Sequence, residues 1–345
     1  MKIILAGGGT LGSVSPLIAI WQKLKAKDEN LDAFFIGTKK GPEKELVNRY
    51  QIPFKYIISG KFRRYFSLLN IIDLFKIILG IIQSLLLLKK IKPDAIVSAG
   101  GFIAVPLIWA SRFYKTKVIL YQSDLKIGLA NKLCQKRADY IFTAFSETVS
   151  QFSKKAEVAG TVLREEIAKV ESRRPTRKEP LNILILGGGI GSQKINQLAV
   201  DSIKQLSEKF KIIHMTGKNK RSKTQDHNYQ SFEFLTDDYY QKIAEADLVI
   251  SRAGLSTLME LSYLAKPAIL IPLPDSAQEK NAEYLCQKKS AIYLNQKELN
   301  SEKLITAINQ AINDKGQLAN LADNIHQIFL HGGEEKIAQR IYELK

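Results

Sequence analysis

The feature that most constrains the fold is an apolar strand, a glycine-rich turn and a helix start, which follow one another in this order twice. The first copy, ILAGGGTLGSVSPLIAI, covers residues 4–20, and the second, LNILILGGGIGSQKINQLAV, covers residues 181–200. Turns of this kind leave backbone N–H groups free to bind an anion where the helix begins. A tight connection that binds no ligand has the same pattern, so one copy alone is weak evidence.

Apolar runs typical of buried strands alternate with helical segments after each copy. After a first helix expected at about 16–27, these runs lie at 33–38, 94–101, 117–123 and 139–145. After the second copy they lie at 211–217, 231–236, 247–254 and 266–274. This order predicts an α/β fold with two successive βαβ domains, each with a parallel sheet buried on both faces. Ligands of such sheets bind beyond the carboxyl ends of the strands, so two facing domains predict a cleft with a site on each wall.

The boundary between the halves is marked by SRRPTRKEP at 172–180, a basic stretch with prolines that is typical of an interdomain linker. We predict an N-terminal domain over 1–165 and a C-terminal domain over 166–333. The last segment, GGEEKIAQRIYELK, predicts a helix with acidic residues in its first turn, which either domain can accommodate.

The chain of 345 residues has a formal net charge of +17, which points to an anionic partner. Nucleic acid, a membrane surface and phosphorylated substrates are candidates, and a general solubility charge is the alternative. Neither zinc-finger ligand spacing nor an RNA-recognition signature is visible, so we expect no nucleic acid partner. Cys134 and Cys286 are far apart in the sequence and predict reduced thiols in a cytoplasmic protein, and the N-terminus lacks the pattern of a secretory signal.

The most apolar segment is KFRRYFSLLNIIDLFKIILGIIQSLLLLKKIK at 61–92. Its interruptions, Asn70, Asp73, Lys76, Gly80 and Gln83, recur every three or four positions and form one stripe on a helix. This stripe argues against a membrane-spanning helix. Basic residues flank the segment at both ends: Lys61, Arg63, Arg64, Lys89, Lys90 and Lys92. The pattern favours docking on an anionic bilayer, and a buried packing helix is the alternative.

A further motif is SRAGLSTLMELSYLAKPAILIPLP at 251–274, in which a strand ends at 252–254 and a helix begins near Ser256. The start of this helix is another candidate anion site. Glu260, about one turn in, either accepts two ribose hydroxyls or only complements the helix dipole, and the spacing alone does not decide.

These motifs together resemble the MurG family of N-acetylglucosaminyltransferases. The matching blocks, in family order, are GGTLGSVSP (8–16), SAGGF (98–102), residues 128–129 with 131–132, Arg164, GGGIGSQKIN (187–196) and RAGLSTLME (252–260) followed by Gln278 and 281–282. The resemblance implies a GT-B fold, which has two Rossmann-like domains with parallel sheets facing across a cleft, and a helix at 334–345 that packs back on the N-terminal domain.

The resemblance also implies an inverting transfer in peptidoglycan synthesis. The donor is UDP-N-acetylglucosamine (UDP-GlcNAc), held mainly by the C-terminal domain. The acceptor is the 4-hydroxyl of undecaprenyl-diphospho-N-acetylmuramoyl-pentapeptide (lipid I), held at the N-terminal glycine turns. The family uses no metal-binding D-x-D motif and no cofactor, and this sequence contains no D-x-D. The family implies a peripheral protein on the cytoplasmic face of the bacterial membrane.

The family's site residues transfer to matching positions here. Glu260 is implied to bind the ribose hydroxyls, and Gln278 to bind the sugar hydroxyls. The donor phosphates are implied to meet backbone groups of Gly254, Leu255, Ser256 and Thr257, with Arg164 and Gly189 lining the nucleotide site and Thr236 contacting uracil. The turn implied to approach the reacting centre and the acceptor diphosphate contains Thr10, Leu11 and Gly12.

The acceptor side departs from the family pattern. Ser13 stands where the family has a histidine, the usual candidate for the general base, and Leu11 replaces a glycine and is expected to narrow the turn. Phe102 replaces a tyrosine, and the family's H-E-Q-N segment here ends in Asp124. A serine hydroxyl is too weak a base near pH 7, so we hypothesise that Asp124 is the catalytic base. The alternative is that Asp124 only hydrogen-bonds the loop.

The same departures keep two other functions open. One is a related GT-B transferase that glycosylates another membrane lipid, such as diacylglycerol or a different polyprenyl diphosphate. The other is a non-catalytic protein that binds nucleotide sugars, since Ser13 replaces the family's histidine while the donor motif is retained.

Overall fold

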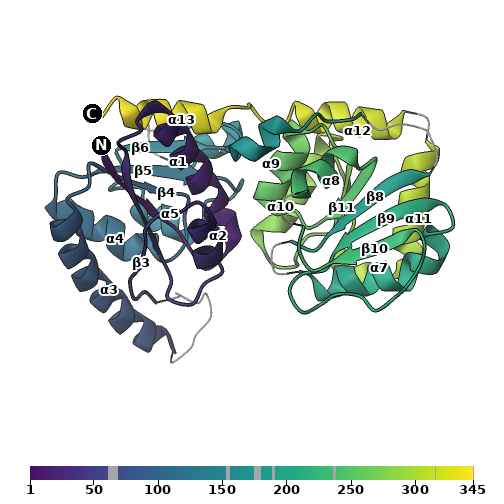
Figure 1. Cartoon of the computed structure of the whole chain (residues 1–345), viewed down its shortest axis with the longest axis horizontal. Coiled ribbons are helices and arrows are strands. Elements are labelled where there is room, and N and C mark those ends of the chain that lie inside the picture. Colours follow the sequence, from purple (N-terminus) through teal and green to yellow (C-terminus); the bar gives the residue numbers. More distant parts are fainter. Residues whose placement is uncertain are drawn as a thin grey trace. The chain divides into compact units, whose positions relative to one another are not determined.

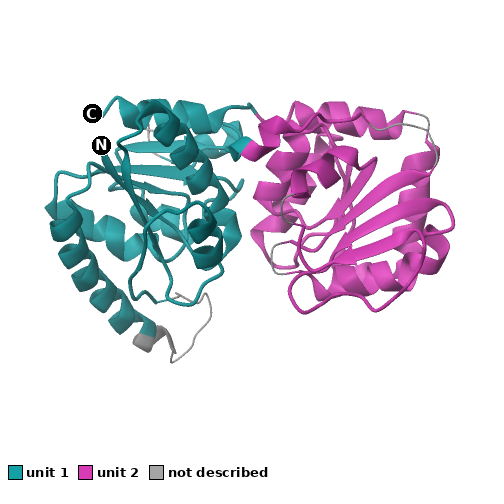
Figure 2. Ribbon diagram, in the orientation of Figure 1, with its two compact units in different colours: residues 1–165, 330–345 teal, residues 166–329 magenta. Residues whose placement is uncertain are grey.

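The chain forms two compact units in the computed structural model: Met1–Glu165 with Leu330–Lys345, and Glu166–Phe329 (Figure 2). The structure describes residues 1–60, 69–152, 156–174, 180–188, 191–235, 238–314 and 316–344, and within 69–72 it describes the backbone only. Both chain ends belong to the first unit (Figure 1). We call the two parts unit 1 and unit 2 and treat each by itself.

The described part of unit 1 is built on a parallel sheet of seven strands in the order β3-β2-β1-β4-β5-β6-β7. Its strands are β1 (Lys2–Ala6), β2 (Asp32–Gly37), β3 (Phe54–Tyr56), β4 (Ala95–Ser98), β5 (Lys117–Gln122), β6 (Tyr140–Thr143) and β7 (Ala156–Val158). Strand β1 is central, and its Ile3 lies opposite Ala33 on β2 and Ala95 on β4. The carboxyl ends of β1, β4 and β5 are therefore neighbours at one edge.

Helices cover both faces of this sheet. They are α1 (Ser15–Lys27), α2 (Glu43–Arg49), α3 (Leu69–Ile91), α4 (Ala104–Ala110), α5 (Leu129–Cys134), α6 (Ser146–Val149) and α13 (Gly333–Tyr342), with short 3-10 turns η1 (Leu11–Ser13) and η2 (Ser111–Phe113). One face packs against α3, α4 and α5, where Leu88, Leu107 and Cys134 join a buried cluster with strand residues. The last helix, α13, packs along α1 and so belongs to unit 1.

The described part of unit 2 is built on a parallel sheet of six strands in the order β10-β9-β8-β11-β12-β13. Its strands are β8 (Leu181–Leu186), β9 (Phe210–Met215), β10 (Tyr229–Phe232), β11 (Leu248–Ser251), β12 (Ala268–Leu270) and β13 (Ile292–Tyr293). Its helices are α7 (Gln193–Leu206), α8 (Tyr239–Glu245), α9 (Leu255–Tyr263), α10 (Ala277–Gln287), α11 (Ser301–Asn313) and α12 (Gln317–His326), with 3-10 turns η3 (Glu165–Lys169), at the boundary between the units, and η4 (Gln296–Glu298). Helices α7 and α11 pack on one face, where Leu198 and Ile308 meet Ile183 of β8.

The predicted α/β class with two parallel sheets is confirmed. The strand predicted at 231–236 is displaced, because β10 starts at Tyr229 and ends at Phe232. Its last residue, Phe232, pairs with Met215, where the neighbouring strand β9 also ends. The short strands β3, β7 and β13 were not predicted, since each has three residues or fewer.

A stretch at 172–180 was predicted as an interdomain linker, and it is described up to Arg174. Its residues 172 and 173 form hydrogen bonds with unit 2. The Ser172 hydroxyl donates to the carbonyl of Leu264, and the Arg173 guanidinium pairs with both oxygens of Asp247 at 3.3 Å. The buried ammonium of Lys266 donates to the carbonyl of Arg173. The change from one unit to the other therefore comes earlier, between Glu165 and Glu166.

Candidate active site

Unit 1 gathers its predicted site residues at the carboxyl edge of its sheet. The turn after β1 carries residues 7–13, the turn after β4 carries 99–103, and the loop after β5 carries 123–128. Because β1, β4 and β5 are neighbours, these three loops lie along one edge. Thr10, Leu11, Gly12, Ser13 and Asp124 thus share one edge of one domain.

The first two of these loops touch each other. A Cβ on Gly9, whose φ is +86°, would lie 2.7 Å from the ring of Phe102. A Cβ on Gly101 would lie 3.0 Å from the carbonyl oxygen of Gly8. The positive φ angles of the first turn are at Gly8 and Gly9, while Leu11 begins the 3-10 turn η1, so its side chain introduces no backbone strain.

The side chain of Glu43 stabilises this turn by hydrogen bonds, a role that the sequence did not reveal. Its side chain is fully buried, and Oε1 accepts hydrogen bonds from the Thr38 backbone N–H and hydroxyl, both at 2.6 Å. Oε2 accepts from the Gly9 backbone N–H at 3.3 Å. In the sequence, Glu43 is an ordinary acidic residue at a helix start, and only the fold brings it to the glycine turn.

Ser13, at the family's histidine position, is 9% exposed, and its hydroxyl donates to the Thr10 carbonyl at 3.5 Å. Asp124 is half-buried, and its backbone carbonyl accepts from the Gln122 amide at 2.8 Å. Asn131 in turn donates to the Gln122 side-chain oxygen at 2.8 Å. The loop that carries Asp124 is therefore fixed by a buried amide network.

Arg164 also lies in unit 1, where it donates from Nη1 to the Tyr50 hydroxyl at 3.1 Å. The other described candidates for the donor site, Gly254 to Glu260 and Gln278, lie in unit 2. Gly189 and Thr236 fall outside the described residues.

In unit 2, Arg252 joins the loops that follow three neighbouring strands. It donates from Nη2 to the Ser192 hydroxyl after β8 at 2.7 Å, and from Nη1 to the carbonyls of Ile271 and Pro272 after β12 at 2.8 and 2.9 Å. Arg252 itself follows β11, and burial lowers the pKa of its guanidinium. Its place in the family block was visible in the sequence, but these three bonds were not.

Helix α9 begins at this same edge. Gly254 is its N-cap residue and has an extended backbone, and Leu255, Ser256 and Thr257 form the first turn. The backbone N–H groups of a first helical turn have no partner within the helix and point toward an incoming anion. The resemblance implies that these four residues contact the donor phosphates, and they lie together at the start of α9.

Glu260 follows one turn later and is only 4% exposed. Its Oε2 accepts from the Tyr239 hydroxyl at 2.8 Å, and its Oε1 from the Tyr240 hydroxyl at 3.5 Å. Both tyrosines begin helix α8. The contact with two tyrosines was not predicted, and it bears on how a ligand reaches this carboxylate.

Gln278 lies in the first turn of α10, directly after the loop that follows β12. Its side-chain oxygen accepts from the Leu273 backbone N–H at 3.0 Å, which shapes the loop. Asn281, fully buried, donates to the Ala253 carbonyl at 3.2 Å and so ties α10 to the start of α9. Within the described ranges, no group of three or more His, Cys, Asp or Glu side chains is arranged to hold a metal ion.

A second candidate functional surface is helix α3 (Figure 1), which exposes many apolar side chains. Its exposed apolar side chains, between 49% and 66% accessible, are Leu74, Phe75, Ile78, Leu79, Ile82 and Leu86. Part of the predicted polar stripe faces the unit: Gln83 accepts from the Ile58 backbone N–H at 2.8 Å, and a Cβ on Gly80 would lie 2.1 Å from the Ile58 carbonyl oxygen. Asp73 of the stripe is buried, whereas Lys76 is exposed. Exposed Trp109, Phe113 and Leu133 lie on neighbouring elements that pack around α4.

The predicted segment 61–92 is only partly covered by this helix, and Lys61, Arg63 and Arg64 lie outside the described residues. Lys89 and Lys90 end the helix and are exposed, as is Lys92. No helix in the described part of the chain has the length and apolar character needed to cross a bilayer.

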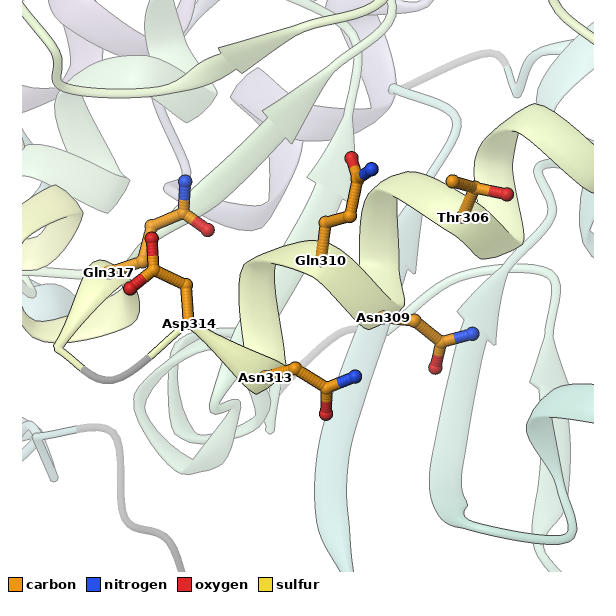
Figure 3. Close-up of a pocket in the computed structure, with 6 residues that line it drawn as sticks. All are labelled: Thr306, Asn309, Gln310, Asn313, Asp314 and Gln317. Carbon is orange, nitrogen blue, oxygen red and sulfur yellow. The ribbon is translucent and has the colours of Figure 1, made fainter.

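An open hollow of about 630 Å³ lies along α11 and the start of α12. Figure 3 shows its polar lining of Thr306, Asn309, Gln310, Asn313, Asp314 and Gln317. None of these residues was predicted to act in a site, and the hollow is separate from the loops that Arg252 joins.

Comparison with protein families defines the class. Residues 3–143 match the glycosyltransferase family 28 N-terminal domain, and residues 182–341 match the glycosyltransferase family 28 C-terminal domain. The chain therefore belongs to glycosyltransferase family 28, and within it to the MurG transferases, as the following relatives show.

Two curated relatives carry the name UDP-N-acetylglucosamine--N-acetylmuramyl-(pentapeptide) pyrophosphoryl-undecaprenol N-acetylglucosamine transferase. The protein of Clostridium perfringens is 36% identical, and the match covers 89% of each chain. That of Legionella pneumophila is 34% identical, and the match covers 99% of this chain and 96% of the relative. Among solved structures, MurG of Acinetobacter baumannii superposes with a TM-score of 0.77 at 23% identity, covering 99% of both chains, and so shares the fold.

Proposed function

We propose that this protein transfers N-acetylglucosamine from UDP-GlcNAc to the 4-hydroxyl of the N-acetylmuramic acid of lipid I, which yields lipid II with inversion at the anomeric carbon. The observation that carries this proposal is the match to relatives named for this reaction over nearly their whole length. The site geometry supports it, because Arg252 joins three loops around the start of α9.

In this proposal unit 2 binds the donor. The backbone N–H groups of 254–257 meet the diphosphate, where the dipole of α9 adds a partial positive charge. Glu260 accepts the ribose hydroxyls, and Gln278 reads the sugar hydroxyls. Arg164, Gly189 and Thr236 complete the nucleotide site. UDP-GlcNAc is a substrate, and the proposed reaction uses no bound cofactor or metal.

Unit 1 then presents the acceptor. Thr10, Leu11 and Gly12 approach the acceptor diphosphate, and Asp124 takes the proton of the 4-hydroxyl as its oxygen attacks the anomeric carbon. The bond from that carbon to the diphosphate oxygen breaks, and UDP leaves with the electron pair. Ser13, which is nearly buried and donates to Thr10, shapes the turn instead of acting as the base.

The role of Asp124 is tested by Asp124→Asn, which keeps the shape of the side chain and removes its basicity. Loss of a general base lowers turnover by about a hundredfold or more. We expect this loss in turnover with an unchanged affinity for UDP. Turnover within about threefold of the wild type contradicts the proposal and leaves Asp124 as a residue that only shapes the loop.

We further propose that unit 1 docks on the cytoplasmic face of the membrane through α3. An exposed apolar helix face with lysines at its end suits an anionic bilayer, since the apolar side chains enter the interface and the lysines meet lipid phosphates. Trp109 adds an amphipathic ring, of the kind that favours the interface. Docking through this surface would bring unit 1, which carries the proposed acceptor loops, to the membrane that contains the lipid acceptor.

The docking surface is tested by the double variant Ile78→Asp with Leu86→Asp, because both side chains are about half exposed or more and contribute little to the core. Binding to vesicles with anionic lipid is expected to fall by about tenfold or more, since charges replace two apolar side chains that enter the bilayer in this proposal. Val200→Asp, at an exposed apolar position in unit 2, is the matched control and is expected to bind normally. Unchanged binding of the double variant contradicts this surface.

The reaction itself is tested by measuring UDP release from UDP-GlcNAc with a lipid I analogue in anionic vesicles. Acceptor-dependent release supports the proposal. Release only with diacylglycerol or another polyprenyl diphosphate favours the related transferase, which the altered positions Leu11, Ser13, Phe102 and Asp124 make a specific alternative. UDP binding without release on any acceptor favours a non-catalytic protein.

A further inference from the structure

The tyrosine pair on Glu260 has a consequence for how the nucleotide binds. Tyr239 is the first residue of α8, and its hydroxyl donates to Glu260 Oε2 at 2.8 Å. It therefore lies on the carboxylate that the proposed donor site uses for the ribose hydroxyls.

The carboxylate of Glu260 is closed to solvent in this state. Its side chain is 4% exposed, and the second tyrosine, Tyr240, approaches the other oxygen at 3.5 Å. The two rings pack against each other with centroids 5.2 Å apart. A ligand hydroxyl that binds Oε2 from the same side competes with the Tyr239 hydroxyl.

A phenol hydroxyl and a ribose hydroxyl offer the carboxylate the same kind of bond, an O–H donor to a charged oxygen. Burial and the charge of Glu260 raise the pKa of Tyr239 well above its ordinary value, so this hydroxyl keeps its proton and remains a donor. The two tyrosine hydroxyls thus satisfy the buried carboxylate within the protein, which avoids the cost of an unpaired charge.

We propose that Tyr239 is a determinant of donor affinity, whose hydroxyl occupies the diol-binding position of Glu260 and is displaced by the cis-diol of a ribonucleotide. This inference deepens the proposed function and rests on it. Displacement lowers the affinity for a ribonucleotide, because one charged hydrogen bond is lost as another forms. A nucleotide without the diol leaves the Tyr239 contact in place and incurs no such loss.

The test measures the dissociation constants of UDP and of 2′,3′-dideoxy-UDP by calorimetry, for the wild type and for Tyr239→Phe. The phenylalanine keeps the ring and its packing and removes only the competing hydroxyl. We expect UDP to bind about 3- to 10-fold more tightly to the variant, as the loss of one competing hydrogen bond implies, with dideoxy-UDP unchanged. The preference for the diol therefore rises by the same factor.

Tyr240→Phe is the matched control, because its hydroxyl is 3.5 Å from the carboxylate and is expected to compete less. Glu260→Gln, made alone and together with Tyr239→Phe, is expected to abolish the effect of Tyr239. An unchanged preference for the diol in Tyr239→Phe overturns the proposal. A reduced preference also overturns it, since Tyr239 then holds Glu260 ready for the diol.

The wild type separates this inference from the proposed function. Tight binding of UDP and turnover by the wild type, with no change in diol preference in Tyr239→Phe, removes the role of Tyr239 and leaves the transferase intact. A wild type that binds neither nucleotide overturns both.

Discussion

The two glycine turns of this protein have the same strand–turn–helix plan but are supported by opposite charges. The turn after β1 rests on the buried carboxylate of Glu43, which accepts the Gly9 backbone N–H. The turn after β8 is held by the guanidinium of Arg252, which donates to Ser192. Lys220 adds a second cation there, with its ammonium 3.4 Å from the Gly191 carbonyl.

The helix starts differ in the same way. Ser192 caps α7 by accepting the Ile195 backbone N–H at 3.3 Å, whereas α1 has no side-chain cap and has Pro16 in its first turn. A carboxylate beneath a turn uses one of the N–H groups that would otherwise face an anion, and it repels that anion. A guanidinium beside a turn adds a positive charge instead. The comparison indicates that the second turn binds an anion more strongly than the first.

The largest expected effect comes from removing the support of the first turn. Glu43→Ala leaves three partly buried donors without their acceptor, and each such donor costs about 1–3 kcal/mol. We expect the free energy of unfolding of unit 1 to fall by about 3–5 kcal/mol. Both tryptophans, Trp21 and Trp109, lie in unit 1, so urea unfolding followed by tryptophan fluorescence reports on this unit.

Glu43→Gln serves as the matched variant, because its amide oxygen keeps the two bonds to Thr38 while its NH2 group faces the Gly9 N–H. We expect a smaller loss of stability and an unchanged affinity for UDP. If Glu43→Gln reduces the free energy of UDP binding by as much as it reduces the free energy of unfolding of unit 1, the two turns do not have separate roles. The comparison then fails.

The second prediction removes the support of the other turn. Arg252→Ala breaks three hydrogen bonds that hold the loops after β8, β11 and β12 together. Hydrogen bonds to charged groups contribute about 1.5–3 kcal/mol, so we expect UDP affinity to fall by about 100-fold. Arg252→Lys keeps the charge but not the planar fork and is expected to recover part of this loss. Calorimetry with UDP measures both, and full recovery by lysine would show that charge alone is needed.

The contrast between the turns also shows what the sequence can predict. The strand–turn–helix pattern is local, so both turns and both parallel sheets followed from apolar runs and glycines. The supports were not predictable, because Glu43 is 34 residues from Gly9 and Arg252 is 60 residues from Ser192. Tyr239 likewise reaches Glu260 only through the packing of α8 on α9. The stripe of polar residues in the sequence predicted that α3 has a separate apolar face. Only the fold shows that Gln83 of this stripe packs against Ile58.

The third prediction concerns pH and the region beneath the second turn. His214 on β9 is fully buried, contacts Tyr229 at 2.9 Å and Asn196 at 3.1 Å, and burial lowers its pKa to about 4. In the unfolded chain its pKa is about 6.5, so between these values the unfolded state binds the extra proton and the stability of unit 2 falls as the pH falls. We expect this residue to lower the free energy of unfolding by about 2 kcal/mol between pH 7 and pH 5.

The measurement is urea unfolding followed by circular dichroism, in which the transition of unit 2 is the one that leaves tryptophan fluorescence unchanged. His214→Gln does not titrate and controls for the carboxylates that also protonate in this range. An equal loss of stability in the wild type and in His214→Gln would contradict a neutral buried histidine at this position.

The smallest expected effect tests the second cation of the second turn. Lys220 is exposed, so its attraction to the nucleotide phosphates is screened by solvent and salt. Lys220→Ser is expected to weaken UDP binding by about threefold at low ionic strength, and this difference is expected to vanish near 0.5 M salt, where the Debye length is only about 4 Å. Lys211→Ser is the matched control, because Lys211 is equally exposed but lies near the start of β9, at the opposite edge of the sheet from the glycine turn. If both variants weaken UDP binding alike, the net charge of the unit attracts the nucleotide. If only Lys220→Ser does, the cation beside the turn acts locally, as the contrast with the carboxylate beneath the first turn requires.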